Sequence, residues 1–320
     1  MARRGTAERR DGAVRNTAMV DREELYSSLN EGILAERLVS FERNLRKNID
    51  LIRRHGGLRR IVPALDGKMA VVIAAGPSLD DNTDLLRQYQ HRQELVYIAA
   101  DMALRPLAQR GIVPRFVVSC ETSPVDFFGG IDTSKMHLLA FSCMSHANLL
   151  RWRGGVSFYN WMMRRPEYES LWERAGQDLG FVATGGLVTT QAVAFAMGCG
   201  ISGLVLAGND LGFTERYHAR ESVPCRASVD GGERLAPPES REMARRRRAM
   251  EYRIERGARS FYTTGQFLAA KMWLEDLFKG NRIPVYDCSD PGCSEKYVAK
   301  MDLKDVLYSL PGRNKRKRRK

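Results

Sequence analysis

Short apolar runs alternate with longer amphipathic segments from residue 68 onward. Short runs that are apolar throughout are typical of strands buried on both faces, as in parallel sheets. They predict strands over 69–74, 95–99, 116–119, 138–141, 156–159, 181–183, 204–207 and 284–287. The segments between them predict helices over 82–91, 103–109, 146–152, 166–178, 189–197 and 265–279. The sequence therefore predicts a Rossmann-like α/β fold, a mostly parallel sheet with helices on both faces.

The chain before this region has a helical pattern. Apolar residues recur every three to five positions from Leu25 to Ile52, and Gly56 and Gly57 follow them. This predicts an N-terminal helical extension, one helix or a pair, that either caps the main domain or dimerises. Its place in the chain is residues 23–66, after a disordered basic N-terminus at 1–22.

The remaining divisions follow from composition. We expect one α/β domain over 67–310 and a basic tail over 311–320. Residues 212–262 break the alternation of strands and helices, and there we expect an excursion over the site with a polar helix near 239–256.

Charge sits mainly at the ends of the chain. The formal net charge is +13, and seven of the eight residues from Arg313 to Lys320 are basic. Nucleic-acid binding by the main domain is therefore not expected. The tail is either solvated or docks on an acidic protein, RNA or anionic lipid. The N-terminus lacks an apolar segment, and no apolar run is long enough to cross a bilayer, so we expect a cytoplasmic protein without a membrane span.

Polar residues follow the predicted strands at the edge where parallel α/β sheets bind ligands. These strand-end residues are the candidate site: Gly76, Pro77, Ser78, Asp101, Glu121, Thr184, Gly185, Gly186, Thr189, Asn209 and Asp210, with His218 eight residues on. Each alone could be a turn or helix-cap residue. Their coincidence at five strand ends favours a functional site.

Two small-residue turns suggest a nucleotide site. The turn Gly76–Ser78 and the segment Thr184–Gly186 each follow a strand and precede a helix, a geometry that presents N–H groups to phosphate. Neither the nucleophile-elbow sequence G-x-S-x-G nor a Walker A or G-x-G-x-x-G motif is present, so Ser78 is predicted to bind phosphate or carboxylate. Cys288 and Cys293 lack a second pair at zinc spacing, and no metal site is expected from them.

The motifs taken together resemble the MptE-like family. The resemblance rests on Ala-Ala-Gly-Pro-Ser-Leu at 74–79, Gly-Ile-Val-Pro-Arg-Phe at 111–116, Thr-Gly-Gly-Leu-Val-Thr-Thr-Gln at 184–191 and Gly-Asn-Asp-Leu-Gly-Phe-Thr at 208–214. The family includes 6-hydroxymethylpterin diphosphokinases and the central domain of motility-associated (Maf) flagellin glycosyltransferases. The Maf branch looks closer, although Glu121 and Asn209 stand where Asp and Gln are common.

The resemblance implies two reactions. A glycosyltransferase would move a CMP-activated nonulosonic acid to a protein Ser or Thr, such as on flagellin, without a metal. His218 and Asp210 would be its catalytic residues, with His218 as general base. A diphosphokinase would use ATP and Mg²⁺, with Asp101, Glu121 and Asp210 as metal candidates. A nucleotide-binding module without catalysis is the third alternative.

Overall fold

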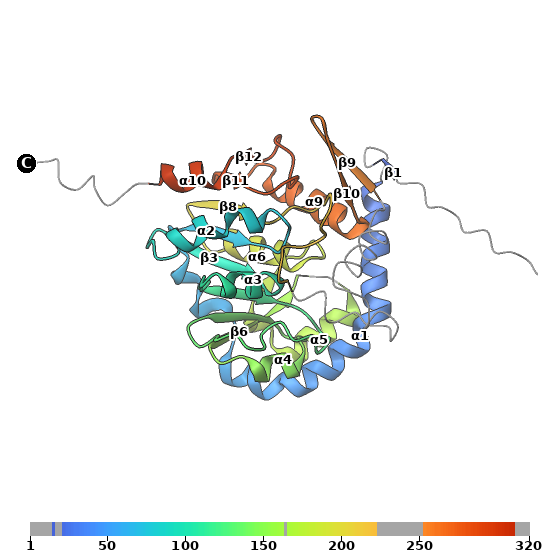
Figure 1. The fold of residues 1–320 in the computed structure, drawn as a ribbon. Helices are drawn as coiled ribbons and strands as arrows, with labels where there is room; N and C mark the ends of the chain where they lie inside the picture. Colours follow the sequence, from blue (N-terminus) through green and yellow to red (C-terminus); the bar gives the residue numbers. More distant parts are fainter. Residues whose placement is uncertain (1–14, 17–20, 163–164, 223–251, 311–320) are drawn as a thin grey trace, which may run out of the picture.

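The fold is organised around one sheet of nine parallel strands (Figure 1). The computed structural model describes residues 15–16, 21–162, 165–222 and 252–310. The strand order is β12-β11-β8-β2-β3-β4-β5-β6-β7. Each neighbouring pair in this order runs parallel. The predicted fold class is therefore confirmed.

The predicted strands lie in this sheet with ends shifted by one or two residues. They are β2 (Met69–Ile73), β3 (Leu95–Ala100), β4 (Phe116–Ser119), β5 (His137–Phe141), β6 (Gly155–Trp161), β7 (Phe181–Val182), β8 (Gly203–Ala207) and β11 (Val285–Asp287), joined at the edge by β12 (Ala299–Lys300). Successive residues of β2 enter opposite cores: Val71 and Ile73 pack on one face, Ala70 and Val72 on the other. This burial on both faces explains why the strand lacks polar alternation.

Helices cover both faces of the sheet. One face carries α2 (Leu79–Tyr89), α3 (Leu104–Gln109) and α10 (Leu303–Ser309). The other carries α1 (Arg22–His55), α4 (His146–Arg151), α5 (Pro166–Ala175), α6 (Val188–Met197) and α9 (Gly265–Phe278). Single 3₁₀ turns lie at Leu58–Arg60, Val62–Ala64, Asp101–Ala103 and Gln177–Leu179. No helix in the described ranges has the length and apolar character to span a bilayer.

The order in which the chain adds strands to the sheet reverses beside β2. Strand β2 pairs with β3 on one side and with β8 on the other, and later strands continue outward from each. At such a switch point the loops after the two central strands diverge and leave a crevice beyond their carboxyl ends. The fold therefore places Gly76, after β2, beside Gly208, after β8.

The N-terminal extension is one helix that caps the sheet. Helix α1 runs unbroken until Gly56, whose φ of +70° ends it in the left-handed conformation that glycine favours. Phe41 is fully buried and meets the rings of Phe141 and Trp161 edge-on, at 5.4 and 5.5 Å between centroids. The Asn48 amide donates to the carbonyls of Ser142 and Met144. Of the two predicted roles, the helix takes the capping one.

The structure corrects the expected helix at the end of the excursion. Residues 252–256 form strand β9 (Tyr252–Arg256), which makes an antiparallel hairpin with β10 (Arg259–Thr263). Polar and apolar residues alternate in β9, as in a strand with one exposed face, whereas the prediction followed charge content alone. Residues 239–251 and the basic tail 311–320 lie outside the described residues.

The N-terminus and C-terminus also hold elements that the sequence did not suggest. Within 1–22, the segment described before α1 is β1 (Arg15–Asn16), which pairs parallel to β9. Strand β12, with two residues, and helix α10, with seven, follow the last strand that the sequence predicts, and neither was expected.

The α1 cap predicts a large difference between two positions on one helix. We expect Phe41→Ala to lower the free energy of unfolding by about 3–5 kcal/mol, because it leaves a cavity among the rings of Phe141 and Trp161. Val39, with 77% of its surface exposed, is the control, and Val39→Ala should change stability by less than about 0.5 kcal/mol. Urea unfolding measures both. Equal effects would show that α1 does not pack on the sheet in solution.

Candidate functional site

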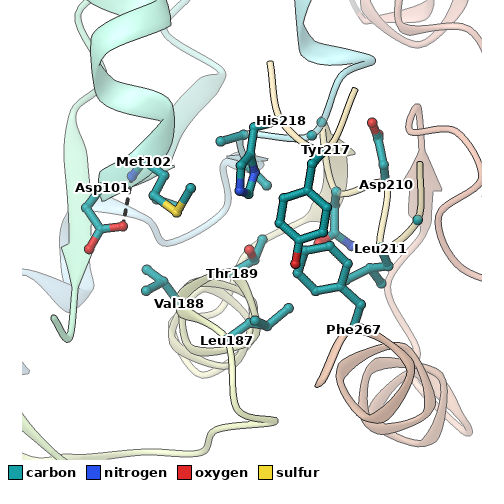
Figure 2. Close-up of a pocket in the computed structure, with 17 residues that line it drawn as sticks. Asp101, Met102, Leu187, Val188, Thr189, Asp210, Leu211, Tyr217, His218 and Phe267 are labelled. Atoms are coloured by element: carbon teal, nitrogen blue, oxygen red, sulfur yellow. Dashed lines mark hydrogen bonds between the residues drawn. The ribbon is translucent and has the colours of Figure 1, made fainter. Parts of the chain in front are cut away.

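A cavity of about 130 Å³ lies beyond the carboxyl ends of β2, β3 and β8 (Figure 2). It occupies the crevice that the strand order predicts, with the start of α6 as one wall. The residues that line it are Ala74, Ala75, Gly76, Ala100, Asp101, Met102, Leu187, Val188, Thr189, Gly208, Asn209, Asp210, Leu211, Gly212, Tyr217, His218 and Phe267. Six predicted site residues are thus brought together: Gly76, Asp101, Thr189, Asn209, Asp210 and His218.

The buried carboxylate of Asp210 holds the turn that follows β2. Its Oδ2 accepts a hydrogen bond from the Ser78 backbone N–H at 2.8 Å, and its Oδ1 accepts from the Ser78 hydroxyl. Gly76 lies so close that an added Cβ would stand 2.6 Å from this carboxylate and 2.5 Å from the Gly208 carbonyl oxygen. The turn therefore requires glycine at position 76.

This arrangement changes the role expected for Ser78. Its hydroxyl and N–H, which the sequence assigned to phosphate, both donate to Asp210. Pro77 and Ser78 are also absent from the residues that line the cavity. In this structure they shape the turn, and a ligand in the cavity would meet Gly76.

Asp210 also holds the loop that follows β11. The backbone N–H of Asp290 donates to Asp210 Oδ1 at 3.3 Å, and that of Gly292 donates to the Asp210 carbonyl oxygen at 2.7 Å. The part-buried Lys300 ammonium fixes the same loop, since it donates to the Asp287 carboxylate at 2.9 Å and to the carbonyls of Ser289 and Pro291. The Asp210 side chain thus joins the ends of three strands, β2, β8 and β11.

Asp101 and Glu121 face different partners. Asp101 is buried, and its carboxylate accepts from the Ser119 hydroxyl at 2.6 Å and from the Met102 N–H at 2.8 Å. Glu121 accepts from the N–H and hydroxyl of Ser123 in its own loop and does not line the cavity. Asp101 therefore belongs to the cavity wall, whereas Glu121 stabilises the loop after β4.

The segment Thr184–Gly186 lies behind the cavity wall. Gly185 packs against Trp273, where an added Cβ would lie 2.7 Å from the indole ring, and its N–H donates to Thr190. The Thr184 hydroxyl accepts from Gly186 N–H and from the buried Gln191 amide. These contacts set the start of α6, whose N-cap residue Leu187 and first residues Val188 and Thr189 reach the cavity.

An aromatic wall completes the cavity. Tyr217 stacks on Phe267 with 5.2 Å between centroids and 13° between planes, and the His218 ring lies 4.4 Å from Tyr217. In Figure 2 the side chains of His218 and Tyr217 point toward Leu187 and Thr189 at the start of α6.

The segment that carries these rings is fastened to the start of α2. The Ala219 N–H donates to the Ala75 carbonyl at 2.8 Å, Arg216 pairs with Asp80, and the Arg220 N–H donates to the same carboxylate. These contacts, and not the length of chain between Asp210 and His218, bring the imidazole back to the strand ends.

The predicted magnesium ligands do not form a group. Among the described residues, no three His, Cys, Asp or Glu side chains are arranged to hold a metal ion. Both carboxylate oxygens of Asp101, and both of Asp210, accept hydrogen bonds from protein donors. Glu121 accepts its hydrogen bonds within its own loop. The donor set therefore does not fit a Mg²⁺ site built from these three residues. Cys288 and Cys293 are free thiols.

Burial perturbs both aspartates of the cavity. Desolvation raises the pKa of Asp101 from 3.8 to about 7, opposed by the hydrogen bond from Ser119 and assisted by the charge of Glu121. Desolvation likewise raises the pKa of Asp210 to about 7, opposed by its hydrogen bonds from Ser78 and Asp290. Both groups therefore titrate near neutral pH.

Comparison with known proteins agrees with the motifs. The family model described as 6-hydroxymethylpterin diphosphokinase MptE-like matches residues 43–216, more than half of the chain. This chain belongs to the MptE-like family. The match begins within α1, earlier than the motifs suggested, and ends between Asp210 and His218.

A solved structure shares the fold. The MAf glycosyltransferase from Magnetospirillum magneticum AMB-1 superposes with a TM-score of 0.55 at 18% sequence identity. The alignment covers 83% of this chain and 37% of that one, so this chain spans well under half the length of its neighbour. No curated protein matches the chain significantly.

The sequence did not indicate the cavity residues that come from distant parts of the chain. Tyr217, Phe267 and Met102 line the cavity from separate elements, and no spacing along the chain relates the first two. Asp80, in the first turn of α2, anchors Arg216. The repeated strand-end pattern was the signal for the rest.

The stability of the protein should respond differently when each of the two cavity aspartates is replaced by asparagine. Both oxygens of Asp210 accept backbone N–H groups, so either orientation of an asparagine amide would face a donor with its NH₂. We expect Asp210→Asn to lower the free energy of unfolding by about 1–3 kcal/mol. In Asp101→Asn, the carbonyl can keep the Met102 N–H while the NH₂ donates to the Ser119 hydroxyl. That variant should fold normally, and equal losses in guanidinium unfolding would contradict these contacts.

The raised pKa of Asp101 also predicts a pH dependence. The folded state holds the proton more tightly than the unfolded state, so Asp101 destabilises the fold increasingly as pH rises from 3.8 to about 7 and fully above it. The stability of Asp101→Asn relative to wild type should therefore increase between pH 4 and 7 and then level off. Denaturant titrations across this range measure the difference, and a flat difference would show that Asp101 is not perturbed.

Proposed function

We propose that this chain is a glycosyltransferase that moves a CMP-activated nonulosonic acid-type sugar to a Ser or Thr hydroxyl of a protein acceptor such as flagellin. The observation that carries the proposal is the cavity at the switch point between β2 and β8, in a chain that shares its fold with a MAf glycosyltransferase. A cytoplasmic setting, where nucleotide sugars are made, fits this activity.

The start of α6 is suited to the donor phosphate. Helix α6 has ten residues, and its first residues face the cavity, so its unpaired N–H groups and dipole favour a negative charge there. The Thr189 hydroxyl adds a donor on the same side. Leaving-group phosphate would be stabilised here as the bond between the anomeric carbon and the phosphate oxygen breaks.

His218 is placed to take the acceptor proton. It lines the cavity across from the start of α6, and imidazole is the side chain best suited to accept a hydroxyl proton near neutral pH. The acceptor oxygen then forms the new bond to the anomeric carbon and CMP departs. Asp210 contributes by holding the Gly76 turn and the β11 loop in place, which makes it a positioning residue in this scheme.

The family description also names a diphosphokinase. That reaction would take ATP with Mg²⁺, and the three carboxylates available for the ion are engaged elsewhere in the described structure. This geometry favours glycosyl transfer as the first activity to test. A binding module without turnover is the outcome in which CMP binds but no transfer follows.

The base assignment predicts separate effects on turnover and on binding. His218→Ala should lower the transfer rate roughly a hundredfold or more, the scale of general-base catalysis, because the acceptor hydroxyl keeps its proton. CMP affinity should change less than about threefold, since the base acts on the acceptor. A transfer assay paired with calorimetric titration of CMP measures the two effects.

The matched control is His91→Ala, which removes an exposed imidazole on the loop after α2 and should alter neither quantity. If His218→Ala transfers at the wild-type rate, His218 is not the base. If ATP with Mg²⁺ raises the melting temperature and CMP does not, the diphosphokinase reaction replaces the proposal.

A further inference from the structure

The Asn209 side chain is buried without hydrogen bonds at the wall of the cavity. It is 2% exposed, and neither its Oδ1 nor its Nδ2 has a partner among the described residues. Most buried amides are paired, because an unpaired one loses its hydration without compensation. An amide left unpaired at a cavity wall suggests that its partner is a ligand.

Other buried asparagines of this chain are paired. Asn160 is fully buried, and its Oδ1 accepts from the Ser142 hydroxyl while its Nδ2 donates to the Gly176 carbonyl, at 2.7 and 3.0 Å. Asn48 uses both ends of its amide as well, on Ser142, Met144 and His146. The unpaired amide is thus a property of position 209 and not a general feature of this core.

The backbone around Asn209 is held from both sides. Its N–H donates to the Ser289 hydroxyl at 2.8 Å. Gly208 before it has a φ of +66°, where an added Cβ would lie 2.5 Å from the Ala74 carbonyl oxygen, and Asp210 after it is fixed by Ser78 and the β11 loop. The backbone that carries the amide is therefore ordered before any ligand enters, and binding does not have to order it.

The chemistry of an amide selects the ligand. An anion alone would satisfy Nδ2 and leave Oδ1 facing negative charge, so the partner must donate and accept side by side. Nucleobase edges have this pattern, and asparagine pairs with them through two hydrogen bonds. Tyr217 and Phe267 supply the aromatic surface that a planar ring needs.

The size of the cavity limits what is enclosed. About 130 Å³ is less than the roughly 300–1,000 Å³ of pockets that hold a whole small ligand. One ring fits such a space, and the rest of a nucleotide would extend from it. We infer that Asn209 is the base-reading residue of the site and pairs with the donor–acceptor edge of the nucleobase beside Tyr217. This inference rests on the proposed use of a CMP-linked donor.

The test compares Asn209→Leu and Asn209→Ala with Asn160→Leu. Calorimetric titration with CMP and with ribose 5-phosphate separates base contacts from phosphate contacts. Both Asn209 variants should bind CMP about ten- to hundredfold more weakly, the usual effect of losing a bidentate pair, while ribose 5-phosphate binding stays unchanged. Asn160→Leu should retain CMP affinity. Without ligand, Asn209→Leu should melt no lower than wild type, whereas Asn160→Leu should melt several degrees lower.

Each other result overturns the inference. If wild type binds CMP and the Asn209 variants bind it equally well, the base is read elsewhere and the proposed function stands. If wild type binds neither CMP nor UMP, AMP or GMP, the inference and the proposed function both fail. A melting loss in both Asn209 variants equal to that of Asn160→Leu would make the amide structural. Weakened binding of a CMP-linked sugar with unchanged CMP binding would assign the amide to the sugar.

Discussion

The Asp210 carboxylate is the contact on which the candidate site depends. It accepts hydrogen bonds from the turn after β2 and from the loop after β11, while its own backbone follows β8. Burial opposes the ionised form and the three donors favour it, which is why its pKa lies near 7 and not at either extreme. With the carboxylate in place, the three strand ends meet at fixed distances and the crevice between them keeps its shape. Leu211, directly after it, has a φ of +57°, a conformation that side chains rarely adopt and that the Thr263 hydroxyl supports through the Leu211 carbonyl.

The remaining walls are built on this centre from distant parts of the chain. Helix α6 contributes an end where backbone N–H groups face the cavity, and the 216–220 segment contributes rings held over it by Asp80. The walls are mainly apolar, and the polar side chains in them are few: two aspartates, one threonine, one asparagine, one histidine and one tyrosine. A site of this kind binds through shape and a small number of directed hydrogen bonds. It suits a ligand with one planar, partly apolar portion and one anionic portion, which is the make-up of a nucleotide.

The sequence predicted the sheet well because a strand that is buried on both faces is a continuous apolar run, which can be seen within a few residues. Val71 and Ile73 face one core while Ala70 and Val72 face the other, so β2 reads as one apolar run. The candidate site was predicted in part by the same logic, since residues after parallel strands share an edge. The roles within it could not be predicted. That Ser78 would donate to Asp210, and Ser123 to Glu121, depends on contacts in space, as does the stacking of Tyr217 on Phe267. The β9–β10 hairpin was missed because charge content outweighed its weak alternation.

The central claim is that a nucleotide binds in the cavity at the switch point of the sheet. A crystal structure of this chain soaked with CMP tests it most directly. We expect electron density for the cytosine ring between Tyr217 and Asn209, with the phosphate at the first residues of α6. Density for CMP at another place on the molecule, for example in the polar groove that contains Arg256 and Arg259, would contradict it, as would an empty cavity at saturating CMP.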